Sequence, residues 1–151
     1  MADTSHRQPS LYETDFHAWA NEQAELLRSR HLDQAELDNI AEEIESMGRS
    51  EKRELVSRLS VLLMHLLKWR FQPALRGKSW RLTIKGQRIE LRRHLRDNPS
   101  LKSHLTEAIA DAYESACVDA ARETELEPDA FPTACPWSYD EITDETFWPE
   151  A

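Results

Sequence analysis

The sequence predicts an all-α fold: a helical bundle of about five main helices around a central third helix, with an extended C-terminal strap. The 151-residue chain has only three glycines, fewer than the tight turns of a β-rich fold of this length require. Its apolar residues recur at helical spacing from Phe16 to Tyr113. Residues 131–151 lack this spacing and are rich in proline and aromatic residues, which favours a strap packed on the helices.

Two amphipathic helices are expected in residues 10–48. The first begins near Ser10 or Thr14. The second begins at Asp33, a residue type that caps helices, and either ends at Gly48 or continues beyond it with a bend. One apolar stripe runs along the second helix, formed by Leu37, Ile40, Ala41, Ile44 and Met47.

The third helix, residues 50–71, is predicted to be central. Its apolar residues cover more than half of its circumference, so other elements must pack on several of its sides. The fourth helix, residues 79–96, has an apolar stripe and, beside it, a stripe of five cations. The predicted basic face consists of Arg81, Lys85, Arg88, Arg92 and Arg96. The fifth helix begins at Asn98-Pro99 and ends before Pro128.

Residues 1–151 are expected to form a single all-helical domain. Residues 1–9 are expected to be flexible, and residues 131–151 form the strap, with one short turn near residues 138–143. No stretch is long and apolar enough for a membrane span, and the N-terminus lacks the apolar core of a signal peptide. We therefore expect a cytoplasmic protein without a membrane partner.

Charge is distributed unevenly along the chain. The net formal charge of −9 combines −8 in residues 1–48, +11 in residues 49–96 and −12 in residues 97–151. The basic middle either pairs with the acidic flanks, faces solvent, or binds an acidic partner such as a nucleic acid. Nucleic acid is the less favoured partner, because the protein as a whole is acidic.

One segment predicts a candidate cleft that binds an anion or a planar group. Around the turn between the third and fourth helices, indoles, amides and guanidiniums gather near a helix N-terminus, which attracts anions. The alternative is a structural corner in which the tryptophans pack and the polar groups cap carbonyls. The cleft residues are Trp69, Gln72, Arg76, Ser79, Trp80, Gln87 and Arg88.

No catalytic residues, metal ligands or cofactors are predicted. The chain has no GxSxG nucleophile elbow, no glycine-rich phosphate loop and no Glu-x-x-His pair. The acids at 42, 43 and 45 do not share the apolar stripe of their helix and are expected to be solvated. Two cysteines, Cys117 and Cys135, fit no zinc spacing and are expected to be reduced and mostly buried.

Several segments together resemble the bacterial family called domain of unknown function 29. They extend over residues 11–149 and read LYETDFHAW, QAELLR, IAEEIESMGRSEKRELVSRL, LLMHLLKWRFQP, RGKSWRLTI, QR, PSLK, AYESA, ET-x-L, FPTACPW and FWP. The resemblance implies a compact all-α domain. It implies no activity and no catalytic residues, because the family has no assigned function.

Two functions stay open at this point. The first is a non-catalytic interaction or adaptor protein that acts through helix faces and binds another protein. The alternative is a nucleic-acid- or anion-binding regulator that uses the basic helix at residues 79–96. An enzyme is the least favoured class. Ligand, partner and oligomeric state stay open; charge separates the two functions, since an adaptor would pair the basic face within the chain and a regulator would expose it.

Overall fold

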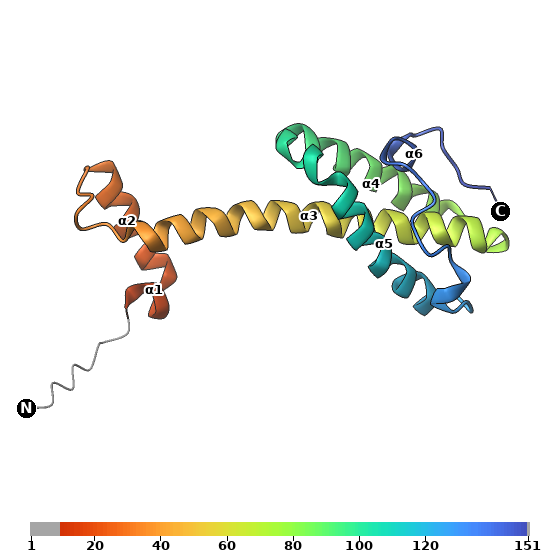
Figure 1. Ribbon diagram of the computed structural model, residues 1–151, viewed down its shortest axis with the longest axis horizontal. Helices are drawn as coiled ribbons and strands as arrows, with labels where there is room; N and C mark the ends of the chain where they lie inside the picture. Colours follow the sequence, from red (N-terminus) through yellow and green to blue (C-terminus); the bar gives the residue numbers. More distant parts are fainter. Residues whose placement is uncertain (1–9, 151) are drawn as a thin grey trace, which may run out of the picture. The chain divides into compact units, whose positions relative to one another are not determined.

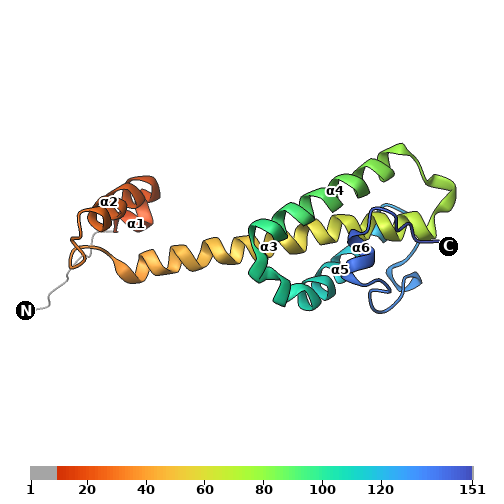
Figure 2. The same ribbon diagram turned by 90° about the horizontal axis from the view of Figure 1, so that it is seen from above.

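The computed structural model describes residues 10–150, and all regular structure in this range is helical (Figures 1 and 2). The all-α prediction is therefore confirmed. The expected flexibility of residues 1–9 lies outside the described residues. The described chain forms two compact units, divided between Gly48 and Arg49, and the prediction of a single folding domain stays a prediction. None of the described helices combines the length and the apolarity that crossing a membrane takes.

The N-terminal unit begins with two helices where one was expected. Helix α1 (Leu11–Thr14) is separated from α2 (Phe16–Arg28) by Asp15, whose backbone leaves the helical region at φ −149° and ψ 83°. The Asp15 carboxylate accepts the N–H of Ala18 at 3.1 Å and so caps α2. Ser10 precedes α1 as predicted, but its side chain makes no capping bond.

Helix α3 (Leu37–Phe71) is one continuous helix of 35 residues. A helix start at Asp33 and a stop at Gly48 are therefore both wrong, whereas the alternative of continuation past Gly48 is confirmed. Gly48 does not adopt a positive φ, and a Cβ there would meet no atom within 4 Å. Nothing at this position requires glycine, so it acts as an ordinary helical residue instead of a C-terminal cap.

The C-terminal unit is built on the later turns of α3. Helices α4 (Lys78–Asp97) and α5 (Leu105–Arg122) both pack on this part of α3, as Figures 1 and 2 show. The short helices η1 (Pro73–Leu75) and η2 (Pro99–His104) make the turns before α4 and α5. Six leucines of α3 are fully buried at the centre: Leu55, Leu59, Leu62, Leu63, Leu66 and Leu67. This segment matches the predicted central helix.

Helix α5 approaches α3 closely because its contact surface carries alanines. The ridge of Ala108, Ala112, Ala116 and Ala120 is fully buried. The hydroxyl of Ser60 on α3 reaches the carbonyl of Ala112 at 3.3 Å. Small side chains on one surface allow two helix axes to approach, which explains this contact.

The chain after α5 folds back over the unit, and its residues 131–150 form the predicted strap. The segment after α5 contains η3 (Pro128–Ala130) and α6 (Tyr139–Thr143), and Ser138 forms a capping box with Glu141 at the start of α6. Four of the seven prolines lie in this segment, at 128, 132, 136 and 149. Its buried anchors are Phe131, Trp137, Ile142 and Pro149.

Lys68 is one of the buried basic side chains of this unit. Lys68 of α3 lies with its ammonium 2.7 Å from Glu123 and 4.7 Å from the centre of the Trp80 ring. The hydrogen bond from Lys68 lowers the pKa of the Glu123 carboxyl, although desolvation opposes this shift. The pair compensates a buried charge that would otherwise be costly.

Truncating the central helix tests its place in the core. Leu62→Ala is expected to lower the free energy of unfolding by about 2–5 kcal/mol, because a fully buried leucine leaves a cavity. Leu82→Ala is the matched control, since Leu82 is 50% exposed. Urea unfolding followed by circular dichroism measures both, and equal losses in the two variants would contradict the predicted centre.

Removing the partner of Lys68 should lower the free energy of unfolding by an amount that depends on pH. Glu123→Gln is expected to cost about 1–2 kcal/mol near pH 7, because the buried ammonium loses its ionised acceptor. The folded-state pKa of Glu123 is lowered, so this stabilisation is present above its unfolded pKa and disappears as pH falls through the folded value. Urea unfolding at decreasing pH should show the two proteins converge; a constant difference would argue against the ion pair.

Candidate functional site

The residues of the predicted cleft separate into two groups. The first group consists of Trp69, Arg76 and Arg88, which contact Trp148 and Pro149 near the end of the strap. The Trp69 and Trp148 rings lie 4.7 Å apart, and the Arg88 guanidinium lies 5.3 Å from the Trp148 ring. Arg76 donates to the Trp69 carbonyl at 2.6 Å and to the Pro149 carbonyl at 3.5 Å. These contacts match the structural corner that the sequence left open as the alternative to a cleft. In such a corner the guanidiniums cap carbonyls.

The second group consists of Gln72, before η1, and Ser79, Trp80 and Gln87 of α4. Trp80 packs against the Lys68 ammonium, and Ser79 is exposed, with its carbonyl accepting a bond from Thr83. Gln72 is the N-cap residue of η1, and its side chain accepts no cap bond. The Gln87 side-chain oxygen is buried, and no described residue donates a hydrogen bond to it. The structure therefore does not gather the seven predicted residues around one cleft.

Arg88 departs from the predicted basic face of α4. It is almost fully buried and donates to the carbonyls of Ile142 at 2.8 Å and Phe147 at 2.7 Å. Burial lowers the pKa of its guanidinium, and the nearby Asp144 and Glu145 carboxylates oppose this shift. The prediction that Arg88 belongs to the basic face was therefore wrong. Helical periodicity cannot show that the strap covers this position.

The other four cations of the face are exposed. Arg92 pairs with Glu145 at 2.6 Å, and Arg96 lies 3.6 Å from Asp97. Arg81 and Lys85 make no ion pair with another described residue. Internal pairing thus accounts for part of the predicted basic face and leaves two cations in solvent.

The cysteines are not activated. Both are half-buried and line one surface cavity beside Tyr113. Burial raises the pKa of each thiol, and burial also raises the pKa of Tyr113, whose hydroxyl donates to the Pro132 carbonyl at 2.5 Å. Thiols with raised pKa values are poor nucleophiles near neutral pH, so the cavity lacks an activated group.

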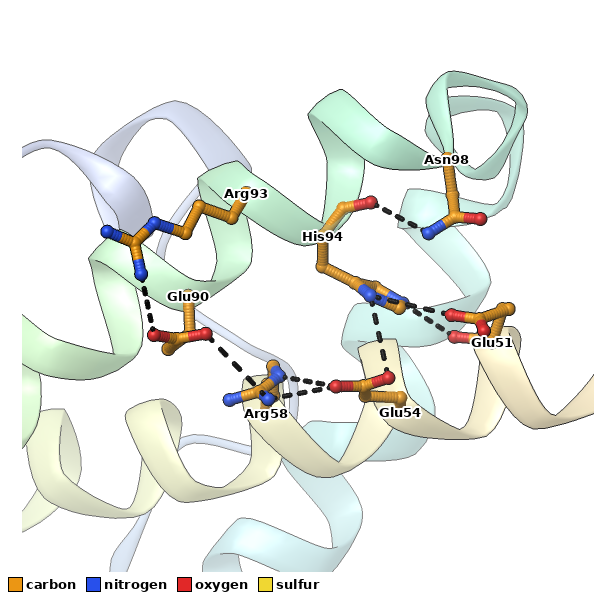
Figure 3. Close-up of polar contacts among 7 residues, drawn as sticks. All are labelled: Glu51, Glu54, Arg58, Glu90, Arg93, His94 and Asn98. Atoms are coloured by element: carbon orange, nitrogen blue, oxygen red, sulfur yellow. Dashed lines mark hydrogen bonds and ion pairs between the residues drawn. The ribbon is translucent and has the colours of Figure 1, made fainter.

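A cluster of two carboxylates and a histidine was missed by the sequence analysis. Glu51 and Glu54 of α3 face His94 of α4, and their potential ligand atoms all lie within 4.8 Å of one another (Figure 3). Forty-three residues of chain separate Glu51 from His94. The only local signal is the spacing of three between the glutamates, which places both on one helix face.

An open apolar surface lies within the N-terminal unit, between α2 and the first turns of α3. It is a groove of about 360 Å³, which we call the apolar groove. Its walls carry ten side chains, eight of them apolar. The lining residues are Phe16, Trp19, Ala20, Gln23, Ala24, Leu27, Ile40, Glu43, Ile44 and Met47.

Two residues of the groove are bound by one carboxylate outside its lining. Glu36, just before α3, accepts the Trp19 indole N–H at 2.8 Å and the Gln23 amide at 2.9 Å. Gln23 in turn accepts the backbone N–H of Glu36 at 2.7 Å. Trp19 and Gln23 are buried, so these bonds fix α2 to the start of α3.

A second contact joins α1 to the same wall of α3. The Tyr12 hydroxyl donates to the Glu43 carboxylate, and this bond raises the pKa of Tyr12 to about 12. The Tyr12 ring also packs 4.5 Å from Trp19 and 6.0 Å from Phe16. Tyr12 therefore forms an aromatic cluster with Phe16 and Trp19, two residues that line the groove.

The outer edge of the groove is exposed. Phe16 is 50% exposed, Ile44 59% and Met47 63%. The stripe of residues 37–47 was predicted from periodicity alone, which cannot distinguish a covered stripe from an open one. Large apolar side chains gathered on one exposed surface are typical of interaction sites.

Over residues 11–148, the chain matches the family described as Domain of unknown function DUF29. The chain belongs to this family. The predicted resemblance is thereby confirmed over nearly the whole chain, and DUF29 carries no functional description to transfer. Neither the curated proteins nor the solved structures compared with this DUF29 chain gave a match.

Arg88 supplies a test of how the strap is held. Arg88→Met keeps most of the side-chain volume but leaves two strap carbonyls without a donor, so we expect a loss of about 1–3 kcal/mol. The strap should also become sensitive to limited proteolysis. Arg81→Met, an exposed cation on the same helix, is the control and should leave stability and cleavage unchanged. Identical behaviour of both variants would rule out the anchoring role.

Proposed function

We propose that this DUF29 chain is a non-catalytic protein-binding module that takes a basic amphipathic helix of another protein into the apolar groove. The observation that carries the proposal is the exposure of Phe16, Ile44 and Met47 around a groove whose Trp19 and Gln23 side chains are held by Glu36. A helix in a hydrophobic groove is a common mode of peptide recognition.

The shape of the groove favours a helical occupant. Its walls are two helices, and a third helix can pack against both at the usual interaxial distance of roughly 8–10 Å. On α3, Leu37, Ile40, Ile44 and Met47 follow steps of three and four, the spacing of a coiled-coil seam. An occupant with apolar residues at the same spacing would cover this stripe.

Charge favours a basic occupant. Residues 1–48 carry a net formal charge of −8, and the Glu43 carboxylate lines the groove itself. Lysines on the polar side of a bound helix would lie in this negative field, which raises the association rate and the selectivity. A second copy of the chain would place two units of the same charge together, which makes self-association less favourable.

The alternative function is anion or nucleic-acid binding on α4. It is supported by exposed Arg81 and Lys85, which border a surface cavity with Trp148. It is less favoured because Arg88 is buried under the strap and Arg92 is paired with Glu145. A site with two available cations would neutralise few phosphates and bind weakly.

Fluorescence anisotropy with a labelled amphipathic peptide tests the proposal. The peptide has leucines at positions i, i+3, i+4 and i+7 and lysines elsewhere; a scrambled peptide of the same composition is its control. We expect saturable binding of the first peptide only. Ile44→Lys should weaken binding at least tenfold, about 1.4 kcal/mol, because it places an ammonium in the groove.

Matched variants separate the outcomes. Leu82→Lys adds the same charge at an equally exposed leucine of α4 and should bind the peptide like the wild type. Equal binding of both peptides, or no binding, would refute the proposal. A dimer by light scattering that Ile44→Lys dissociates would assign the groove to a second copy. Single-stranded DNA binding lost on Lys85→Glu, with no peptide binding, would favour the α4 alternative.

A further inference from the structure

We infer that Glu51, Glu54 and His94 form a binding site for a divalent transition-metal ion such as Zn²⁺. All three residues belong to the C-terminal unit, and two helices bring them together: α3 presents both glutamates, and α4 presents the histidine (Figure 3). The site lies outside the apolar groove and does not depend on the proposed function.

The hydrogen bonding of His94 determines which ring nitrogen faces the glutamates. Nε2 lies 2.8 Å from the backbone carbonyl oxygen of Glu51. A carbonyl only accepts, so Nε2 carries the proton and donates it. In the neutral ring, Nδ1 then has a lone pair and no proton. A histidine that donates one N–H to a carbonyl and offers its other nitrogen is the arrangement typical of metal ligands.

Nδ1 has no hydrogen-bond partner among residues 10–150, although the His94 side chain is only 7% exposed. The atoms that face it are carboxylate oxygens, at 3.7 Å from Glu51 and 3.6 Å from Glu54. These distances exceed those of a hydrogen bond. A lone pair that faces two anionic oxygens is unfavourable unless a proton or a metal ion lies between them.

The separations suit a shared metal ion. Ligands about 2.0–2.1 Å from a tetrahedral Zn²⁺ lie roughly 3.4 Å from one another. The two nitrogen–oxygen distances are close to this value, so a small adjustment of the glutamate side chains would complete the coordination. One imidazole and two carboxylates match the mixed nitrogen and oxygen preference of Zn²⁺, whereas Mg²⁺ and Ca²⁺ prefer oxygen alone.

Neighbouring residues orient the ligands. Arg58 donates to one oxygen of Glu54 at 3.0 and 2.8 Å, which leaves the other oxygen directed at His94. Glu90, held by Arg93 at 3.3 Å, lies 3.9 Å from Arg58 on its other side. Asn98 donates to the His94 carbonyl at 3.1 Å at the end of α4. Such outer contacts typically contribute roughly 10–100-fold to metal affinity.

Three protein ligands leave a coordination position open. The Glu51 and Glu54 side chains are partly exposed, and the cavity beside them is also lined by Asp97 and Asn98. A fourth ligand would be water or a group supplied by a partner. The site therefore has the ligand count of an open site and not of a closed structural one.

Isothermal titration of the metal-stripped full-length protein with ZnCl₂ tests the inference. We expect one ion per chain with micromolar affinity. Co²⁺ should give visible absorption bands of a tetrahedral complex. His94→Gln retains a donor for the Glu51 carbonyl but removes the ligand, and it should weaken binding by roughly 100-fold. Glu51→Gln, a milder change at a partly exposed position, should also weaken it.

His104→Gln is the matched control, because His104 is exposed and lies outside the cluster. It should bind Zn²⁺ like the wild type. Lowering the pH should weaken binding in the wild type, since a metal requires the deprotonated imidazole. No binding by a folded wild type, or equal binding by wild type and His94→Gln, would overturn the inference.

Discussion

The C-terminal unit depends on the burial of one leucine surface. The six fully buried leucines of α3 point in too many directions for a single neighbouring helix to cover them. Helix α4 covers one side, the alanine ridge of α5 another, and the strap encloses the remainder through Phe131, Trp137 and Ile142. Each later element therefore has its place because it removes part of this surface from water.

Covering the leucines also buries a basic side chain of α4. A helix packed on one side by α3 and on the other by the strap must bury some of its basic side chains. Arg88 is such a residue, and it is satisfied by backbone carbonyls of the strap, not by a carboxylate. Ile142 lies in the last turn of α6 and Phe147 lies beyond it, where backbone carbonyls have no intrahelical partner. Arg88 therefore supplies the donors for these carbonyls, and the carbonyls supply the acceptors for its guanidinium.

The predictable part of this structure is the part that periodicity describes. The all-α class, the central position of Leu59 to Leu66 and the turn at Ser138 follow from local spacing and capping, and all are observed. Gly48 led to a wrong prediction of a helix end, because glycine is common just after helix C-termini. A solvent-exposed glycine inside a helix lowers stability by only about 1 kcal/mol. That cost is small beside the tertiary packing of α3.

The candidate sites were less predictable, for a different reason. Spacing shows that Ile44 and Met47 share a face with Leu37, but it does not show whether anything covers that face. The meeting of Glu51 with His94 depends on how α4 returns along α3 after the turn at Pro73. Arg88 belongs to a regular basic stripe in the sequence and becomes buried only through residues more than fifty positions later.

The four prolines after α5 help to explain how this segment stays ordered with few backbone hydrogen bonds. Each proline at 128, 132, 136 and 149 has a fixed φ in the unfolded chain as well as in the folded one. Less conformational entropy is therefore lost when this segment is ordered than for a chain of flexible residues of the same length. The strap gains correspondingly little freedom on detaching, so a few anchors suffice to keep it on the helices.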